Sequence, residues 1–169
     1  ETLDIGIGNF IDSFARHCGI GFPGGPRIAE LAKKGRYLEL PYSIKGMDVS
    51  FSGLLTNLKQ RYDKGVAIED LAYSLQETAF AMVLEAAERA MAHLDKKELL
   101  LGGGVACNSR LQEMSKIMCS ERKAEFFCPK NEFLVDNAGM IAYLGLKMFE
   151  SGCSINAEKA NINASERTD

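Results

Sequence analysis

Apolar residues recur every three or four positions over long stretches of the chain, which predicts amphipathic helices. The first such stripe predicts a helix over residues 5–18. Its members are Ile7, Phe10, Ile11, Phe14 and Cys18. The same periodicity predicts helices over residues 27–34, 51–62 and 68–94. The apolar band of the last helix is too wide for one face, so we expect it to be buried on more than one side.

Turn-forming residues separate these segments. The run Pro-Gly-Gly-Pro at residues 23–26 predicts a tight turn, after which Pro26 starts the next helix. Gly35 is expected to cap the C-terminal end of that helix, because glycine readily adopts the left-handed backbone that such caps need. Residues 37–50 lack helical periodicity and predict a loop with one or two short strands.

The last third of the chain holds two strand–turn–helix units. In the first, the apolar residues 99–101 are followed by three glycines and by a helix with Asn108 in its first turn. In the second, residues 125–128 precede a helix that begins near Asp136. Repeated units of this kind predict parallel strands joined by right-handed crossovers. Ligands of such sheets bind beyond the carboxyl ends of the strands, where Asn108 and Asp136 would lie.

Composition narrows the class of protein. A chain of 169 residues with 46% hydrophobic content and a net charge of −3 fits one globular domain, with no global attraction to nucleic acid or to a membrane surface. The five cysteines form no C-x-x-C pair, which favours reduced thiols in a cytoplasmic protein over a disulfide framework or a zinc finger. No apolar run is long enough for a membrane span, and no signal peptide is visible.

The ends of the chain differ in character from its middle. We expect residues 1–150 to form the domain and 151–169 to form a polar tail or linker, because the chain beyond Gly152 is rich in Asn, Ala, Glu and Ser. The chain opens on Glu1 and enters a helix-like pattern at once. It is therefore interpreted as an excerpt of a longer polypeptide that begins inside a domain.

The glycine-rich turn at residues 102–104 is a candidate ligand site. Glycines let backbone N–H groups approach a ligand closely, and the first N–H groups of a helix attract anions. No Gly-Lys-Ser/Thr follows, so the turn is not a Walker A loop, and Cys107 stands where a dinucleotide fingerprint needs its third glycine. A nucleotide-facing turn and a purely structural turn both remain open. Cys107 is either a thiolate near a helix N-terminus or a small buried hydrophobe.

Two aspartates are further candidates. Asp12 lies one helical turn from both Gly8 and Arg16. It either accepts a hydrogen bond from a ribose hydroxyl, in the space that Gly8 leaves, or forms a surface ion pair with Arg16. Asp136 precedes Asn137 at a helix start and is either the N-cap or a carboxylate ligand of a metal. The residues alone supply no set of partner ligands for such a metal.

Basic residues form three loose clusters in this acidic chain, at residues 33–36, 59–64 and 122–123. Each cluster has acidic neighbours, so a solvated surface is the expected role, and a local contact with RNA phosphates is the alternative. No Ser/His/Asp or Cys/His arrangement for nucleophilic catalysis is visible.

Six runs of residues, in a fixed order along the chain, resemble a known family. They are residues 1–9, 21–26, 45–54, 70–80, 103–106 with Asn108, and 136–142. Together they resemble the TsaD family, the tRNA adenosine threonylcarbamoyltransferases, in its archaeal and eukaryotic-cytosolic branch. The resemblance implies an α/β, actin-like (ASKHA, RNase H-like) fold of two halves that close on a nucleotide. This chain would be the C-terminal subdomain, helix-rich with few parallel strands, without its first strands and without the N-terminal half.

The resemblance also implies roles for single residues. The nucleotide or substrate would be bound by Asp12, Gly25 and Asn108, with Gly103 and Gly104 in the same turn as Asn108. Asp136 would be one ligand of a divalent metal, iron or zinc. The paired histidines and the tyrosine that complete the family's metal site would lie outside this chain.

Two positions depart from the family pattern. Archaeal relatives often carry a Glu four residues after Gly25, where this chain has Ala29 followed by Glu30. A shift of one residue along a helix turns the side chain by about 100°, so Glu30 is a poor substitute. The family has Ala before its binding asparagine, where this chain has Cys107, and we expect that change to be tolerated.

The resemblance implies that the parent protein transfers a threonylcarbamoyl group from threonylcarbamoyl-adenylate to the exocyclic amine of the adenosine next to the tRNA anticodon. ATP or the adenylate would be its ligand, and the isolated chain would be inactive. Its partners would be tRNA, the missing N-terminal half, and a kinase-like subunit and a small dimerisation subunit of the KEOPS complex. The alternative is a non-catalytic nucleotide-binding half that docks those subunits.

Overall fold

The computed structural model describes residues 4–162. The chain divides into two compact units, Glu1–Val135 and Asp136–Asp169. The predicted boundary between a domain and a polar tail at residue 150 stays a prediction, and residues 163–169 of that tail lie outside the described residues. No described helix is both long enough and apolar enough to cross a membrane.

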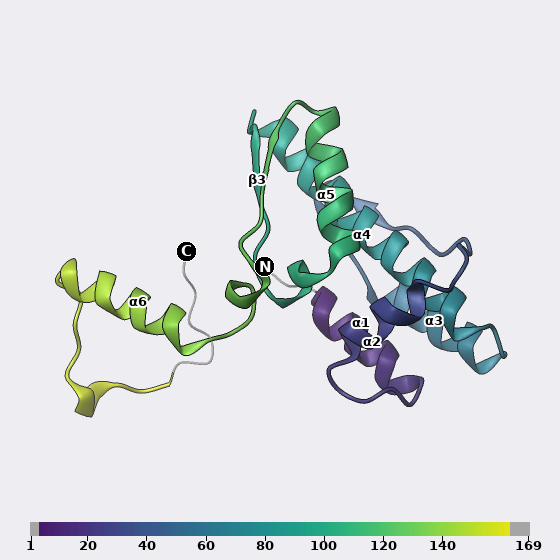
Figure 1. Cartoon of the computed structure of the whole chain (residues 1–169), viewed down its shortest axis with the longest axis horizontal. Helices are drawn as coiled ribbons and strands as arrows, with labels where there is room; N and C mark the ends of the chain where they lie inside the picture. The colour runs from purple at the N-terminus through teal and green to yellow at the C-terminus, as the bar shows by residue number, and fades with distance from the viewer. Residues whose placement is uncertain (1–3, 163–169) are drawn as a thin grey trace. The chain divides into compact units, whose positions relative to one another are not determined.

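The first unit is built mainly from helices around the long helix α4 (Figure 1). Its α-helices are α1 (Ile7–His17), α2 (Gly24–Ala32), α3 (Ser52–Asp63), α4 (Ile68–His93) and α5 (Ser109–Glu121). Helix α4 packs against α2, α3 and α5. Its residues Leu71, Leu75 and Phe80 are fully buried together with Phe10 and Phe14 of α1. The prediction that this helix is buried on more than one side is therefore confirmed.

Two short strand pairs accompany the helices in the described residues. Strands β1 (Ile44–Lys45) and β2 (Asp48–Val49) form an antiparallel pair in the predicted loop. Strands β3 (Glu98–Leu100) and β4 (Glu125–Phe127) are parallel, with Leu99 opposite Phe126, and α5 connects them. The predicted parallel strands and the helix-rich α/β class are confirmed.

Helix α5 lies along α4 in the same direction. Arg110 near its start pairs with Glu77, and Arg122 just after its end pairs with Glu88. Because strand β3 follows α4 and strand β4 follows α5, both strands run back from the C-terminal ends of these helices and lie alongside α5 (Figure 1). The turn from β3 into α5 therefore lies beside the middle of α4, where Gln76 and Glu77 accept hydrogen bonds from the start of α5.

Two expectations for the turns around α2 need correction. Helix α2 begins at Gly24, three residues earlier than predicted, so Pro26 sits inside its first turn, where its missing N–H is not needed. Gly35 does not cap α2, which ends at Ala32 with Lys33 as its C-cap. Glycine is required there for space instead, since a Cβ would lie 2.0 Å from the carbonyl oxygen of Glu69.

The glycine-rich turn also differs from the prediction. It leads into a 3-10 helix, η1 (Gly104–Cys107), and α5 begins only at Ser109. Asn108 is therefore the N-cap of α5 and not a residue of its first turn. Gly103 is the residue of this turn that adopts the left-handed backbone, with φ 86°.

The region after β4 contains a 3-10 helix, η2 (Asn131–Phe133), that belongs to the first unit. The second unit comprises helix α6 (Ala138–Glu150) and the 3-10 helix η3 (Ala157–Lys159). The N-cap of α6 is Asn137, whose Oδ1 accepts a hydrogen bond from Met140 N at 3.0 Å. The proposal of Asp136 as the N-cap is therefore wrong, because the chain enters the helix one residue later.

Asp4 caps helix α3 from a distant position in the sequence. Its Oδ2 accepts hydrogen bonds from Ser50 Oγ at 3.0 Å, Phe51 N at 2.5 Å and Ser52 N at 3.0 Å. The N-cap residue of α3, Phe51, has no side chain that could do this. The hydrogen bonds, that of the Ser52 side chain first, lower the pKa of Asp4 from 3.8 to about 2 against the opposing effect of desolvation.

We predict that Asp4→Asn lowers the free energy of unfolding at neutral pH by about 1 kcal/mol or less, as for other partly exposed caps. Because the folded-state pKa of Asp4 is the lower one, its contribution is present above pH 4 and is lost as the pH falls toward 2. Urea unfolding of the full-length protein from pH 7 to pH 2 measures this. The gap between wild type and variant should close at the acid end.

Asp95→Asn is the matched control, since Asp95 is exposed and its ion pair in the described part of the chain is a surface pair with Lys97. Its pH profile should follow that of the wild type. A gap between Asp4→Asn and wild type that stays constant down to pH 2 would contradict the capping role of the Asp4 charge.

Candidate functional site

A cleft of about 870 Å³ opens in the first unit between α1, α2, α4 and the start of α5. Four of the residues predicted to bind a nucleotide line it, and they are Asp12, Gly25, Gly104 and Asn108. Gly103 is not among the lining residues. The structure therefore brings together positions that are up to 96 residues apart in the sequence, and their binding roles stay predictions.

Asp12 holds the start of helix α2 against helix α1. Its Oδ1 accepts a hydrogen bond from the backbone N–H of Gly24 at 2.8 Å. A Cβ on Gly24 would lie 2.4 Å from the Cβ of Ala15, so only glycine permits this approach of the two helices. The alternative of an ion pair with Arg16 is not realised among the described residues.

Gly25, the second glycine of the turn, has a different role from the first. A Cβ built on Gly25 would meet no heavy atom within 4 Å, although the residue lines the cleft. The fold itself therefore does not require glycine at this position. What glycine provides here is a flat backbone surface facing open space, with a helix N-terminus behind it.

Asn108 uses both ends of its amide. Its Oδ1 accepts hydrogen bonds from Arg110 N at 2.9 Å and Leu111 N at 3.3 Å, which caps α5. Its Nδ2 donates to Oε1 of Gln76 on α4 at 2.5 Å. The residue after the glycine-rich turn thus has a structural role, as the cap of α5. One N–H of the Asn108 amide is left for a ligand in the cleft.

Arg110 is tied down by two carboxylates at the edge of the cleft. Its Nε and Nη2 donate to the two carboxylate oxygens of Glu77 at 2.6 and 2.7 Å, and its Nη1 donates to Glu113 at 2.8 Å. The hydrogen bonds that Arg110 donates, first to Glu77 and then to Glu113, raise the pKa of Arg110 above its ordinary value. Its charge is balanced locally, so Arg110 fixes α5 to α4 and is a weak attractor for a phosphate.

Ala29 and Glu30 both line the cleft, on the face of α2. Glu30 is exposed, and its carboxylate accepts a hydrogen bond from Lys33 at 2.6 Å. Helical rotation therefore does not remove Glu30 from the cleft, although a surface ion pair with Lys33 occupies it.

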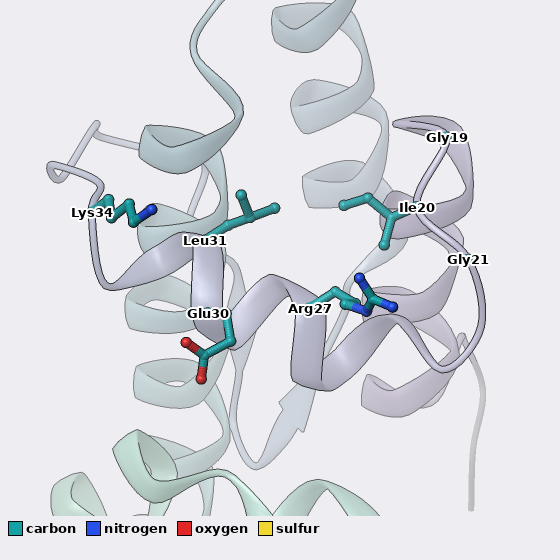
Figure 2. Close-up of a pocket in the computed structure, with 7 residues that line it drawn as sticks. All are labelled: Gly19, Ile20, Gly21, Arg27, Glu30, Leu31 and Lys34. Carbon is teal, nitrogen blue, oxygen red and sulfur yellow. The ribbon is translucent and has the colours of Figure 1, made fainter.

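A smaller hollow of about 510 Å³ lies on the same helix and is shown in Figure 2. Arg27 and Lys34 lie at its two ends with Leu31 between them, and Gly19, Ile20 and Gly21 complete its wall together with Glu30. None of the residues predicted to bind a nucleotide lines it. The larger cleft is therefore the candidate site.

The predicted metal ligand Asp136 belongs to the second unit. Among residues 4–162, no group of three or more His, Cys, Asp and Glu side chains is placed to hold a metal ion. Iron and zinc sites in proteins need several such ligands. The described residues do not make such a site by themselves, and the metal-binding role of Asp136 stays a prediction.

Cys107 also lines the cleft, and it is neither fully buried nor fully exposed. Its Sγ lies 3.8 Å from the backbone carbonyl oxygen of Asn131. Burial, helped by the neighbouring Cys107, raises the pKa of Cys128 above its ordinary value. This polar contact at the edge of the cleft fits neither of the two predicted roles completely.

Gln76, Glu77 and Arg110 were not predicted as site residues. The signal was present in the sequence, because Gln76 and Glu77 interrupt the apolar residues of α4 with a buried amide and a carboxylate. Polar groups at buried positions need hydrogen-bond partners. The sequence could not reveal that those partners come from the start of α5, more than thirty residues further along.

Comparison with known proteins relates the chain to one family. A family model described as tRNA N6-adenosine threonylcarbamoyltransferase (TsaD) matches residues 1–143. A protein of that name from Thermococcus sibiricus is 55% identical over 171 residues, which cover all of this chain and 53% of that protein. Its counterpart in Archaeoglobus fulgidus is 56% identical, with 96% of this chain and 50% of that protein covered. The chain thus spans about half the length of these curated relatives.

Two further similarities extend this comparison. A protein of Methanosarcina mazei named "Probable bifunctional tRNA threonylcarbamoyladenosine biosynthesis protein" is 55% identical over all of this chain, which covers 31% of that protein. Among solved structures, the Thermococcus kodakarensis HypF crystal structure matches with a TM-score of 0.66 and 21% identity, over 85% of this chain and 20% of that one. At that identity the likeness concerns the fold alone.

The contact between Asp12 and Gly24 predicts a difference between two substitutions. Asp12→Ala removes the acceptor for the Gly24 N–H and should lower the free energy of unfolding by about 0.5–2 kcal/mol, as for a lost helix cap. Asp12→Asn keeps an oxygen at the same place and should cost clearly less. Urea unfolding of the full-length protein measures both. Equal destabilisation by the two variants would contradict the assigned hydrogen bond.

Proposed function

Because the chain belongs to the tRNA N6-adenosine threonylcarbamoyltransferase family, we propose that the full-length protein modifies tRNA and that this chain holds the adenylate part of the donor. The observation that carries the proposal is the cleft that Asp12, Gly25 and Asn108 line together. At about 870 Å³ it falls in the size range of small-molecule sites. Apolar side chains and a few convergent polar groups line it, as is usual for such sites.

The polar groups of the cleft suit the parts of an adenylate. Asp12 engages only Oδ1 with Gly24, so Oδ2 is left to accept a hydrogen bond from a ribose hydroxyl. Gly25 lets the ligand lie close to the backbone at the N-terminus of α2, where a negative charge is favoured. The remaining N–H of Asn108 can donate to an acceptor of the nucleotide.

The proposed reaction is transfer of the threonylcarbamoyl group to the exocyclic amine of the adenosine next to the anticodon. The amine nitrogen forms a bond to the carbamoyl carbon, the bond from that carbon to the adenylate phosphate oxygen breaks, and AMP and a proton leave. The residues of this chain would hold the leaving AMP in place, which converts binding energy into orientation of the donor. A divalent metal, iron or zinc, would supply charge stabilisation when bound, with Asp136 as one ligand.

The proposed partners follow from the family. They are tRNA, the N-terminal half of the protein, and the kinase-like and small dimerisation subunits of the KEOPS complex, in the cytoplasm. The alternative proposal is that this half chiefly docks the other subunits and binds a nucleotide without catalysis. Both proposals need the nucleotide cleft, and they differ in whether the full-length protein with its partners modifies tRNA.

We predict that Gly25→Ala weakens binding of AMP at least about tenfold without loss of stability, because the added methyl group enters open space in the cleft. In a helix, Gly→Ala raises stability by up to about 1 kcal/mol, so a weakened fold would not explain the loss. Isothermal titration of AMP into the full-length protein measures the affinity, and a thermal melt monitors the fold.

Gly53→Ala is the matched control. Like Gly25, Gly53 lies in the first turn of a helix, and a Cβ built on it would meet no heavy atom within 4 Å. It lies on α3, however, and does not line the cleft. It should leave AMP binding unchanged. Equal AMP affinity in wild type and Gly25→Ala would remove Gly25 from the proposed site.

A further inference from the structure

Gln76 is a buried amide whose side chain is only partly accounted for by the fold. It lies on α4 between fully buried apolar residues such as Leu75 and Ala79, and 6% of its surface is exposed. It lines the cleft together with Asn108. Burying an amide is unfavourable unless its hydrogen bonds are made, so a glutamine at this position calls for a partner at each end.

The backbone of α5 decides which end of Gln76 faces which way. Asn108 caps two backbone N–H groups of α5, which can only donate, so the capping atom must be the oxygen Oδ1. The other atom of that amide, Nδ2, is then a donor. Its partner on Gln76, 2.5 Å away, must be the acceptor Oε1. The remaining atom of Gln76, Nε2, is therefore fixed as a donor.

Nε2 of Gln76 donates to no residue in the described part of the chain. Within residues 4–162, the side-chain polar atoms that are fully enclosed and have no partner are Asn57 Oδ1 and Thr78 Oγ1. Nε2 of Gln76 has no partner in this part of the chain and is not one of these, so it is not fully enclosed. Nε2 is thus accessible, and the open space beside Gln76 is the cleft. An unpaired donor on a side chain that is more than nine-tenths buried is aimed at whatever fills that space.

We propose that Gln76 is a further nucleotide-binding residue, which donates from Nε2 to an acceptor atom of the bound adenylate while its Oε1 holds Asn108 in register. This inference rests on the proposed function. The hydrogen bonds run from the α5 backbone through Asn108 to Gln76, so the atoms that these two amides leave for a ligand are donors. The two amides therefore select an acceptor, either a phosphate oxygen or a nitrogen of the adenine ring.

Gln76→Glu tests this proposal with little change in shape. The new carboxylate can still accept from Asn108 Nδ2, but it presents an anionic acceptor where Nε2 was a donor. AMP affinity of the full-length protein should fall at least about tenfold at pH 8. Affinity should recover as the pH is lowered, because the protonated carboxyl again carries a donor. If Gln76 only supported Asn108, the glutamate, which still accepts from Asn108 Nδ2, would keep wild-type affinity.

Two further variants make the test specific. Gln60→Glu introduces the same charge at an exposed position of α3 and should leave AMP affinity unchanged at every pH. Gln76→Met removes the donor without adding charge, so its loss of affinity should not depend on pH. Thermal melts of all variants monitor the fold, and Gln76→Met carries the test if Gln76→Glu is not folded.

Adenosine, titrated beside AMP, distinguishes the two sources of the acceptor. A loss seen with AMP but not with adenosine assigns the bond to the phosphate, and an equal loss assigns it to the nucleoside. Wild-type affinity for AMP in folded Gln76→Glu and Gln76→Met overturns the role of Gln76 alone. Absence of AMP binding by the wild type overturns the proposed function and this inference with it.

Discussion

The hydrogen bond from the Gly24 N–H to Asp12 is the interaction on which the candidate site depends. It joins the first turn of α2 to the middle of α1, at a point where a Cβ on Gly24 would lie 2.4 Å from that of Ala15. The same contact sets where α2 begins, and it thereby places Gly25, Ala29 and Glu30 along one wall of the cleft. The Asp12 carboxylate, which we propose as a ligand-binding group, thus also holds α2 against α1. Only one of its two oxygens is used for the scaffold, which allows both roles.

Helix α4 supplies a second constraint, because it places two polar side chains, Gln76 and Glu77, among apolar residues. Gln76 and Glu77 accept hydrogen bonds from Asn108 and Arg110, at the N-terminal end of α5. Since an unpaired buried amide costs about 1–3 kcal/mol, the start of α5 cannot shift along α4 without breaking the bond to Gln76. The glycine-rich turn after β3 is short, and this polar network determines where the turn places the start of α5.

Much of the fold could be predicted from the sequence, and much less of the site. Helices such as α1 and α4 follow from apolar periodicity, and the parallel pairing of β3 with β4 follows from repeated strand–helix units. Contacts between distant residues left no such local signal. Gly35 looks like a helix cap in the sequence, yet it is needed because α4 passes 2.0 Å from where its Cβ would be. Likewise, Asn137 caps α6 in place of Asp136, which is equally suited by residue type.

The most direct test of the account is a crystal structure of the full-length protein with AMP bound. We predict that the nucleotide occupies the cleft between α1, α2, α4 and α5, with a ribose hydroxyl within hydrogen-bond distance of Asp12 Oδ2 and with Gly25 in van der Waals contact. AMP bound in the hollow of Figure 2 or at any place away from this cleft would contradict the central claim.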